Sequence, residues 1–200
     1  MKIFPSTYYL LFILVILSIS SCKKEQTPTK TIYMPQIMKD YFVNYSPGTC
    51  WVFKDSVGRN GQDTVELTFV QKAYFDNGGG TEYEGYIMNY TSNRSINFWI
   101  YAVANDNYSG TATLYPAITG PGEGALEAIY AGTAWMRGVL YDSLPIESGK
   151  IYHNVLKMGE GCFLFNNMRI AKDSGIVAFN AMSPIPSQEG AFYLVGRFKK

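Results

Sequence analysis

The chain has 200 residues, of which 47% are hydrophobic and 16% aromatic, and its formal net charge is +1. This length is enough for one sizeable core and short for two domains. A chain so close to neutral offers no basic stripe, which argues against nucleic acid as a partner.

The first 21 residues have the pattern of a secretory signal peptide. Lys2 carries a positive charge, and residues 8–19 are apolar except for Ser18. A membrane-spanning helix needs about 20 apolar residues, so this run is too short to be one. Its length fits the hydrophobic region of a signal peptide. An uncleaved signal anchor with an incidental cysteine is the alternative.

The signal peptide ends in Ile19-Ser20-Ser21-Cys22, which resembles a bacterial lipobox. That resemblance implies that Cys22 is diacylated and becomes the mature N-terminus. Two acyl chains give stable anchoring, whereas one gives only marginal binding. We therefore expect residues 1–21 to be a lipoprotein signal peptide, residues 22–39 a lipidated tether and residues 40–200 a single β domain.

The first half of this domain predicts strands in chain order. In the run 64–70 (TVELTFV), Val65, Leu67 and Phe69 alternate with polar residues and are expected on one face. A second run, 83–90, follows a glycine-rich turn at 76–80, so the two runs predict a hairpin.

Residues 95–103 (SINFWIYAV) are apolar on both faces, which predicts a central strand that is covered on both sides. A turn at 105–110 and a strand at 111–118 follow. The run 125–142 predicts two strands because Gly132 and Gly138 interrupt it, with a short helix as the alternative.

The remaining strands are expected at 150–158, 162–172, 176–182 and 191–198, with a turn at 173–175 between the second and third of them. Strands of this length and spacing predict an all-β, mainly antiparallel domain. We expect a curved open barrel or a sandwich of about 8–11 strands, similar to a lipoprotein carrier or a lipocalin.

Once Cys22 is assigned to lipid, Cys50 and Cys162 remain as a pair. Outside the cytoplasm they could form a disulfide, which in the chain-entropy description would contribute about 4–5 kcal/mol. The alternative is two buried free thiols, because cysteine in a strand behaves as a small hydrophobe.

The sequence predicts no cofactor and no metal. His153 is the single histidine, and no Cys/His zinc spacing occurs. Residues 120–125 spell G-x-G-x-x-A, but Glu123 would place a carboxylate against a pyrophosphate, so a turn is the better interpretation.

Two resemblances concern the domain itself. The segment DYFVNYSPGTCWVFKDSVGRNGQDTVELT (40–68) and the tail GKIYHNVLKM, NNMRIAKDSGIVAFN and AFYLV resemble small outer-membrane lipoproteins of the Bacteroidota. The chain departs from that pattern at residues 47–50 and at Asp173-Ser174. The resemblance covers about a third of the chain and implies an exported β protein, with no catalytic residues to carry over.

These patterns lead to one expected function with two alternatives. We expect a non-catalytic domain, lipid-anchored in the outer membrane of a bacterial envelope, that binds a ligand or envelope partner (lipid, glycan or protein). The periplasmic face is favoured over the cell surface because Lys23-Lys24-Glu25 lacks a run of acids. A purely structural envelope protein is one alternative, and a glycoside hydrolase using Glu66, Glu82 or Glu84 is the other. Aromatic residues on a concave face would suit a lipid or glycan, although core packing explains them as well.

Overall fold

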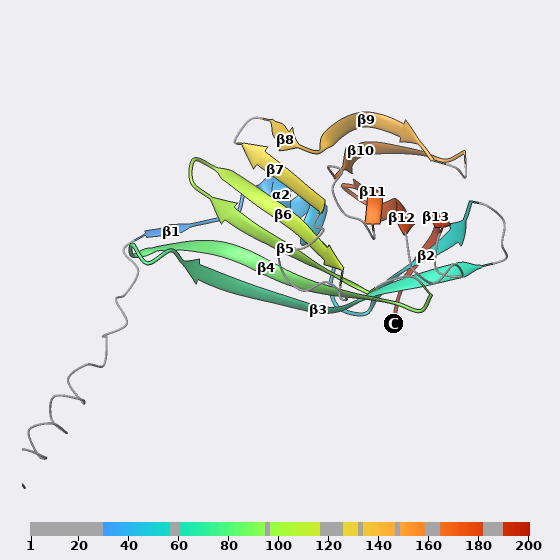
Figure 1. Cartoon of the computed structure of the whole chain (residues 1–200), viewed down its shortest axis with the longest axis horizontal. Coiled ribbons are helices and arrows are strands. Elements are labelled where there is room, and N and C mark those ends of the chain that lie inside the picture. The colour runs from blue at the N-terminus through green and yellow to red at the C-terminus, as the bar shows by residue number, and fades with distance from the viewer. Residues whose placement is uncertain are drawn as a thin grey trace, which may run out of the picture.

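The computed structural model describes residues 30–56, 61–94, 97–116, 126–131, 134–146, 149–158, 165–181 and 190–200 (Figure 1). The described elements are 13 strands and one short helix, which confirms the predicted all-β, mainly antiparallel fold. The elements are β1 (Lys30–Ile32), α2 (Gln36–Phe42), β2 (Thr49–Asp55), β3 (Gln62–Asp76), β4 (Thr81–Ser92), β5 (Phe98–Asn105), β6 (Ser109–Pro116), β7 (Leu126–Ala131), β8 (Trp135–Arg137), β9 (Val139–Pro145), β10 (Ile151–Lys157), β11 (Phe165–Ala171), β12 (Gly175–Ala181) and β13 (Gly190–Lys199).

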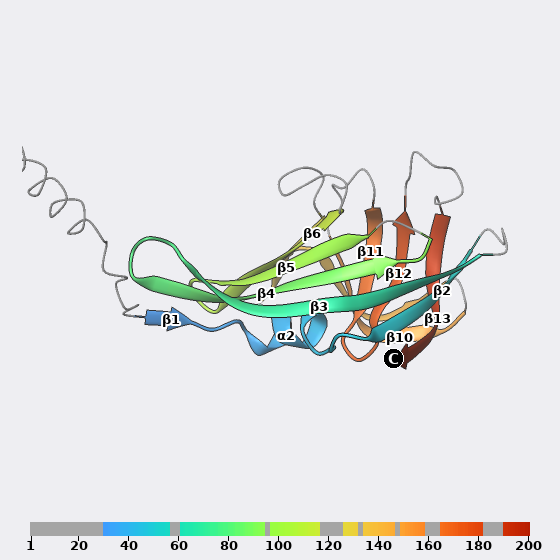
Figure 2. The ribbon, with the colours of Figure 1, turned by 90° about the horizontal axis from the view of Figure 1, so that it is seen from below.

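The strands form one sheet that curves into a nearly closed barrel (Figures 1 and 2). Neighbours in the chain pair antiparallel from β2 to β8 and again from β9 to β13, and β13 pairs back onto β2. The hydrogen-bonded path therefore starts at β8 and ends at β9. β1 lies off this path and pairs parallel with the first residues of β4.

Gly138 joins the two ends of the sheet, because it links β8 directly to β9. A Cβ atom at this position would lie 3.0 Å from the carbonyl oxygen of Lys157 in β10 and 3.6 Å from Cβ of Ala128 in β7. Its φ of 98° also favours glycine. In the described chain, the two ends of the nearly closed barrel thus approach each other at this seam by close packing, without a ladder between β8 and β9.

The sheet has 13 strands in the described chain, against the expected 8–11. Two of them, β1 and β8, have three residues each, which is too short to show a period of two. The helix alternative for 125–142 is wrong, since the described part of that run forms β7, β8 and the start of β9.

One predicted side-chain direction in β3 is wrong. Val65 and Leu67 are fully buried, but Phe69 is 43% exposed. The β3–β4 ladder shifts register between Leu67 and Phe69, which marks a β-bulge. An extra residue in a strand turns every following side chain to the opposite face, so Phe69 points outward.

The predicted double covering of β5 is also wrong. Phe98 and Ile100 are buried inside the barrel, whereas Trp99 and Tyr101 on the outer face are half-buried. The ring of Tyr101 lies 6.5 Å from that of Trp99 and 5.4 Å from that of Tyr115. Outer aromatic rings therefore cover one another in place of a second layer.

Residues 30–45, which we call the N-terminal strap, belong to the folded domain, although residues up to 39 were assigned to the tether. Met34 and Met38 are 3% and 0% exposed. Met38, Tyr41 and Phe42 lie at i, i+3 and i+4 and form the buried face of α2. A seven-residue helix is not stable alone, so this packing must hold it in place.

The helix α2 lies inside the curve of the sheet (Figure 2). It contacts β5 and β6 on one side. On the other side, the hydroxyl of Tyr41 donates a hydrogen bond of 3.0 Å to the carbonyl oxygen of Asn154 in β10. Asp40 forms an ion pair of 2.7 Å with Lys172, which follows β11. The strap therefore connects the two halves of the barrel from within.

Candidate functional site

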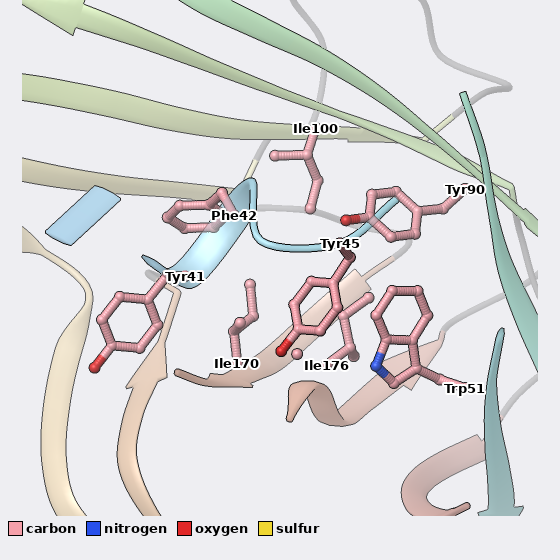
Figure 3. Close-up of a pocket in the computed structure, with 9 residues that line it drawn as sticks. Tyr41, Phe42, Tyr45, Trp51, Tyr90, Ile100, Ile170 and Ile176 are labelled. Atoms are coloured by element: carbon pink, nitrogen blue, oxygen red, sulfur yellow. The ribbon is translucent and has the colours of Figure 1, made fainter. Parts of the chain in front are cut away.

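The concave interior was the expected ligand surface, and Figure 3 shows what occupies it. Side chains from α2, its following loop and five strands converge there and leave no volume that a water molecule could enter. The residues that line this point are Tyr41, Phe42, Tyr45, Trp51, Tyr90, Ile100, Ile170, Gly175 and Ile176. In this part of the described chain the interior is therefore filled by the protein itself.

Ring contacts explain the tight packing. The ring of Trp51 meets that of Tyr45 edge to face at 5.1 Å and that of Tyr90 at 5.9 Å. Tyr90 stacks on Phe98 at 4.8 Å. Burial raises the pKa of Tyr90 well above its ordinary value. The indole nitrogen of Trp51 donates to the carbonyl oxygen of Ser174 at 2.8 Å, so its polar atom is satisfied. These aromatic residues form a core.

Glu84 is the most buried of the three candidate catalytic carboxylates, with an exposed fraction of 0%. One of its oxygens lies 2.8 Å from Nζ of Lys39, and the other lies 2.7 Å from Nζ of Lys72. It also accepts hydrogen bonds from the backbone N–H of Met34 at 2.7 Å and from the hydroxyl of Tyr86 at 2.9 Å. Each of these four groups is a hydrogen-bond donor, and each therefore favours the ionised form of the Glu84 carboxylate.

The protonation of Glu84 follows from this setting. Burial by itself would raise the pKa of Glu84, but the contacts from Lys39, Lys72, Met34 and Tyr86 outweigh it and lower the pKa to about 2. The same pairing raises the pKa of Lys72. At neutral pH Glu84 is thus a paired carboxylate that holds the strap on the sheet, with no proton to donate.

The other two candidates do not converge on Glu84. Glu66 lies on β3 and forms an ion pair with Lys200. Glu84 pairs in register with Tyr74 of β3. Tyr74 lies eight residues after Glu66 on that strand, which corresponds to a separation of about 26 Å. Glu82 is half-buried on β4, where the backbone pairs with Thr31 of β1. No described pocket is lined by two of these carboxylates. Both oxygens of Glu84 are already occupied by its own partners.

The cysteine predictions are only partly within the described residues. Cys50 on β2 is fully buried, and its thiol donates a hydrogen bond of 3.6 Å to the carbonyl oxygen of Gly48. Burial raises the pKa of this thiol. Cys22 and Cys162 lie outside the described residues, as does the run 120–125, so the lipid anchor, the disulfide and the turn at 120–125 stay predictions.

Among the described residues, no group of three or more His, Cys, Asp or Glu side chains could hold a metal ion. His153 is exposed on β10, where its backbone pairs with that of Ser143. No helix in the described ranges is long and apolar enough to span a bilayer.

A groove of about 550 Å³ opens between the first residues of the strap and the turn that joins β5 to β6. The described residues that line it are Lys30, Thr31, Ile32, Tyr33, Met34, Pro35, Gln36, Asn107 and Tyr108. Tyr33 is 62% exposed and Tyr108 is 83% exposed. This lining contains a lysine and no carboxylate, and its size is in the range of ligand sites.

Backbone strain marks one wall of the groove. Asn107 and Tyr108 both have left-handed backbone angles, with φ of 59° and 56°. Asparagine tolerates this conformation in a hairpin turn, but a bulky residue costs about 1–2 kcal/mol there. Because Tyr108 is mostly exposed to solvent, packing of its side chain offsets little of this strain energy. The fold alone would favour glycine at this position.

The groove lies at one end of the barrel, where hydrogen bonds connect the segments. We call this end the entry tip (residues 30–36, 76–83 and 105–109). The hydroxyl of Tyr83 donates to Oδ2 of Asp106 at 3.2 Å and accepts from Nδ2 of Asn77 at 3.3 Å, so it connects two hairpin turns. The backbone N–H of Lys30 donates to the carbonyl oxygen of Gly80 at 3.3 Å. The described chain therefore enters the domain beside the groove.

A smaller hollow of about 280 Å³ lies between β10, β13 and the turn before β12. Its two cations already have partners. Lys150 lies 4.6 Å from the ring centre of Tyr152, and Arg197 donates to the carbonyl oxygen of Asp173 at 3.0 Å. The entry tip is the better candidate site because its tyrosines are held outward.

Sequence reasoning predicted the turn at 105–110 but missed the site. Tyr33 was placed in the tether, and Tyr108 was treated as an ordinary turn residue. The available signal was the pair Asn107-Tyr108, because a hairpin turn favours Asn-Gly and a tyrosine here replaces the usual glycine.

The fold and site together define a class: a nearly closed antiparallel barrel that is filled by its own helix and presents an exposed tyrosine groove where the chain enters. Comparison with protein-family models, curated proteins and solved structures found no match to this chain.

Proposed function

We propose that this protein is a bacterial lipoprotein, anchored in the outer membrane through Cys22, whose non-catalytic β domain binds a ligand or envelope partner on its outer surface. The observation that carries the proposal is the lipobox-like run ending at Cys22, eight residues before the domain begins at Lys30. A short polar link of this kind joins a lipid to a folded domain without adding structure of its own.

The state of the carboxylates supports a non-catalytic role. A glycosidase needs two carboxyl groups that face one sugar, one of them able to donate a proton. Glu84 is held ionised by two lysines, and Glu66 is paired with Lys200 far along the same sheet. The hydrolase alternative therefore gains no support from these residues.

The packed interior supports a binding surface on the outside. A lipocalin-like carrier needs a cavity for its ligand, and the part of the interior described in Figure 3 is closed by aromatic rings. The groove at the entry tip is open and offers exposed tyrosines.

Metabolic labelling tests the anchor. Cells that express the full chain are grown with an alkynyl fatty acid, and the purified protein is examined for label. We expect strong labelling of the natural chain and none of a Cys22→Ala variant. A Cys50→Ala variant is the matched control and should label normally. Equal labelling of the Cys22→Ala variant would overturn the lipoprotein proposal.

A further inference from the structure

The entry tip is the part of the domain that a lipid on Cys22 would hold nearest to the membrane. The backbone of Lys30, the first described residue, is hydrogen-bonded to Gly80 in the β3–β4 turn, so β1 begins at this end of the barrel (Figure 1). Lys30 lies eight positions after Cys22, and a fully extended chain of that length spans at most about 28 Å. This step rests on the proposed anchor.

The groove at this tip has the chemistry of a membrane interface. Tyrosine combines an apolar ring with a polar hydroxyl and favours the headgroup level of a bilayer. Tyr33 and Tyr108 expose most of their surface at the groove. Within the groove, Lys30 supplies a positive charge for a phosphate, because the carboxylates of the entry tip, Asp76, Glu82 and Asp106, are not part of the described lining.

Tyr108 also gains little from the fold in which it sits. Its left-handed backbone favours glycine, and the residue is 83% exposed. Tyr83, Asp106 and Asn77 hold the neighbouring turns together through side-chain hydrogen bonds. A strained, outward tyrosine beside these hydrogen-bonded turns suits a contact with something outside the domain.

We propose that Tyr33, Tyr108 and the groove between them form a docking surface that lies in the headgroup layer of the bilayer that holds Cys22. Two tyrosines and one lysine give weak binding to a membrane when the protein is free. A short tether raises the effective concentration of the tip at the bilayer to about the millimolar range, which makes weak binding sufficient. Docking would fix the orientation of the barrel, with β13 and the C-terminus away from the membrane.

Fluorescence quenching by brominated lipid tests this surface. The full lipidated chain carrying Tyr108→Trp is reconstituted into vesicles of phosphatidylethanolamine and phosphatidylglycerol, with and without brominated phosphatidylcholine. We expect the emission added by the new indole to fall at least twofold in brominated vesicles. Val195→Trp is the matched control, because Val195 is 48% exposed on β13, away from the tip (Figure 2), and its added emission should not change.

Vesicle flotation separates the two proposals. Protein that floats with the vesicles while the Tyr108→Trp emission is unchanged would overturn the docking surface and leave the anchor intact. Protein that does not float would overturn both. Emission that responds to added cell-wall glycan or to an outer-membrane protein, and not to brominated lipid, would also overturn bilayer docking and assign the groove to that partner.

A second pair of variants separates docking from folding. Tyr33→Trp serves as the reporter, and Tyr108→Gly is added to it. Because glycine accepts the left-handed backbone, we expect the melting temperature to stay the same or rise by about 2 °C. We expect quenching of the reporter by brominated lipid to fall by about half. Unchanged quenching would show that Tyr108 does not contact the bilayer.

Discussion

Glu84 shows at the residue scale how a buried charge can hold an irregular segment on a sheet. A fully buried carboxylate is stable only when charged partners and hydrogen bonds replace water. Lys39 of α2, Lys72 of β3 and the backbone of Met34 supply them. One side chain therefore joins the strap to two strands, and its removal should loosen the strap.

We predict that Glu84→Gln lowers the free energy of unfolding by about 3 kcal/mol at pH 7. The pKa of Glu84 is about 2 in the folded protein, below the value near 4.5 of an unfolded chain. A carboxyl group with a lowered pKa stabilises the fold above the unfolded pKa, and this contribution is lost as the pH falls toward 2. Urea unfolding at pH 7 and pH 3 should therefore show a smaller difference between variant and natural chain at pH 3.

Glu82→Gln is the matched control, since Glu82 lies on the same strand and is not fully buried. Its effect should stay within about 0.5 kcal/mol at both pH values. An equal effect of the two substitutions would contradict the role assigned to Glu84.

Sequence alone gave no means to tell these two residues apart. Strand alternation places Glu82 and Glu84 on the same face of β4. What differs is the strap, whose Met34 and Lys39 contact Glu84 from 50 and 45 residues earlier in the chain. Such a pairing depends on the whole fold, so a local pattern does not reveal it.

At the scale of elements, the sequence predicted the β11–β12 hairpin but not the requirement for glycine in its turn. The sequence predicts a turn at 173–175 and a strand from 176, and β12 begins one residue earlier, at Gly175. The structure adds that Gly175 has φ of 74° and that a Cβ atom there would lie 2.7 Å from the indole nitrogen of Trp51. The turn therefore needs glycine both for its backbone and for its contact with β2.

We predict that Gly175→Ala destabilises the protein by about 3 kcal/mol, because backbone strain adds to displacement of the Trp51 ring. Gly78→Ala provides the control. Gly78 has φ of 81° but nothing within 4 Å of an added Cβ atom, so backbone strain of about 1 kcal/mol is the expected cost. Thermal or urea unfolding measures both. Equal losses would mean that contact with Trp51 is unimportant.

Two element-scale errors have a common physical origin. The alternation in residues 64–70 predicts Phe69 on the inner face, but one bulge residue reverses the pattern. The helix α2 is seven residues long, too short for a clear helical period, and its signal was the spacing of Met38, Tyr41 and Phe42. Short irregular features escape pattern analysis because tertiary packing, and not local preference, stabilises them.

At the scale of the whole molecule, strand alternation predicted an enclosed apolar face but not what fills it. A curved antiparallel sheet can enclose either a ligand cavity or a core. Here α2 decides the outcome, because Met38, Tyr41 and Phe42 enter the interior from a helix whose first four residues were assigned to the tether. The position of α2 thus moves the candidate binding site from the inside of the barrel to its entry tip.

The packed interior leads to a prediction that also tests whether the binding site lies at the entry tip and not inside the barrel. Phe42 is 2% exposed and lines the interior in Figure 3, so Phe42→Ala should lower the free energy of unfolding by about 3–5 kcal/mol. The apolar cavity left behind should bind benzene, so benzene should raise the melting temperature of this variant and leave that of the natural chain unchanged. Tyr33→Ala, at a 62% exposed position, is the control and should change stability by less than about 0.5 kcal/mol.

A rise in the melting temperature of the natural chain with benzene would instead mean that the barrel already holds an apolar cavity. A small apolar ligand stabilises a protein only in proportion to its binding to the folded state. That result would restore the interior as a ligand site and give Tyr90, Trp51 and Phe42 a role beyond packing. The expected result would support a packed interior around Phe42, and the vesicle experiment then decides whether the tyrosine groove binds the bilayer.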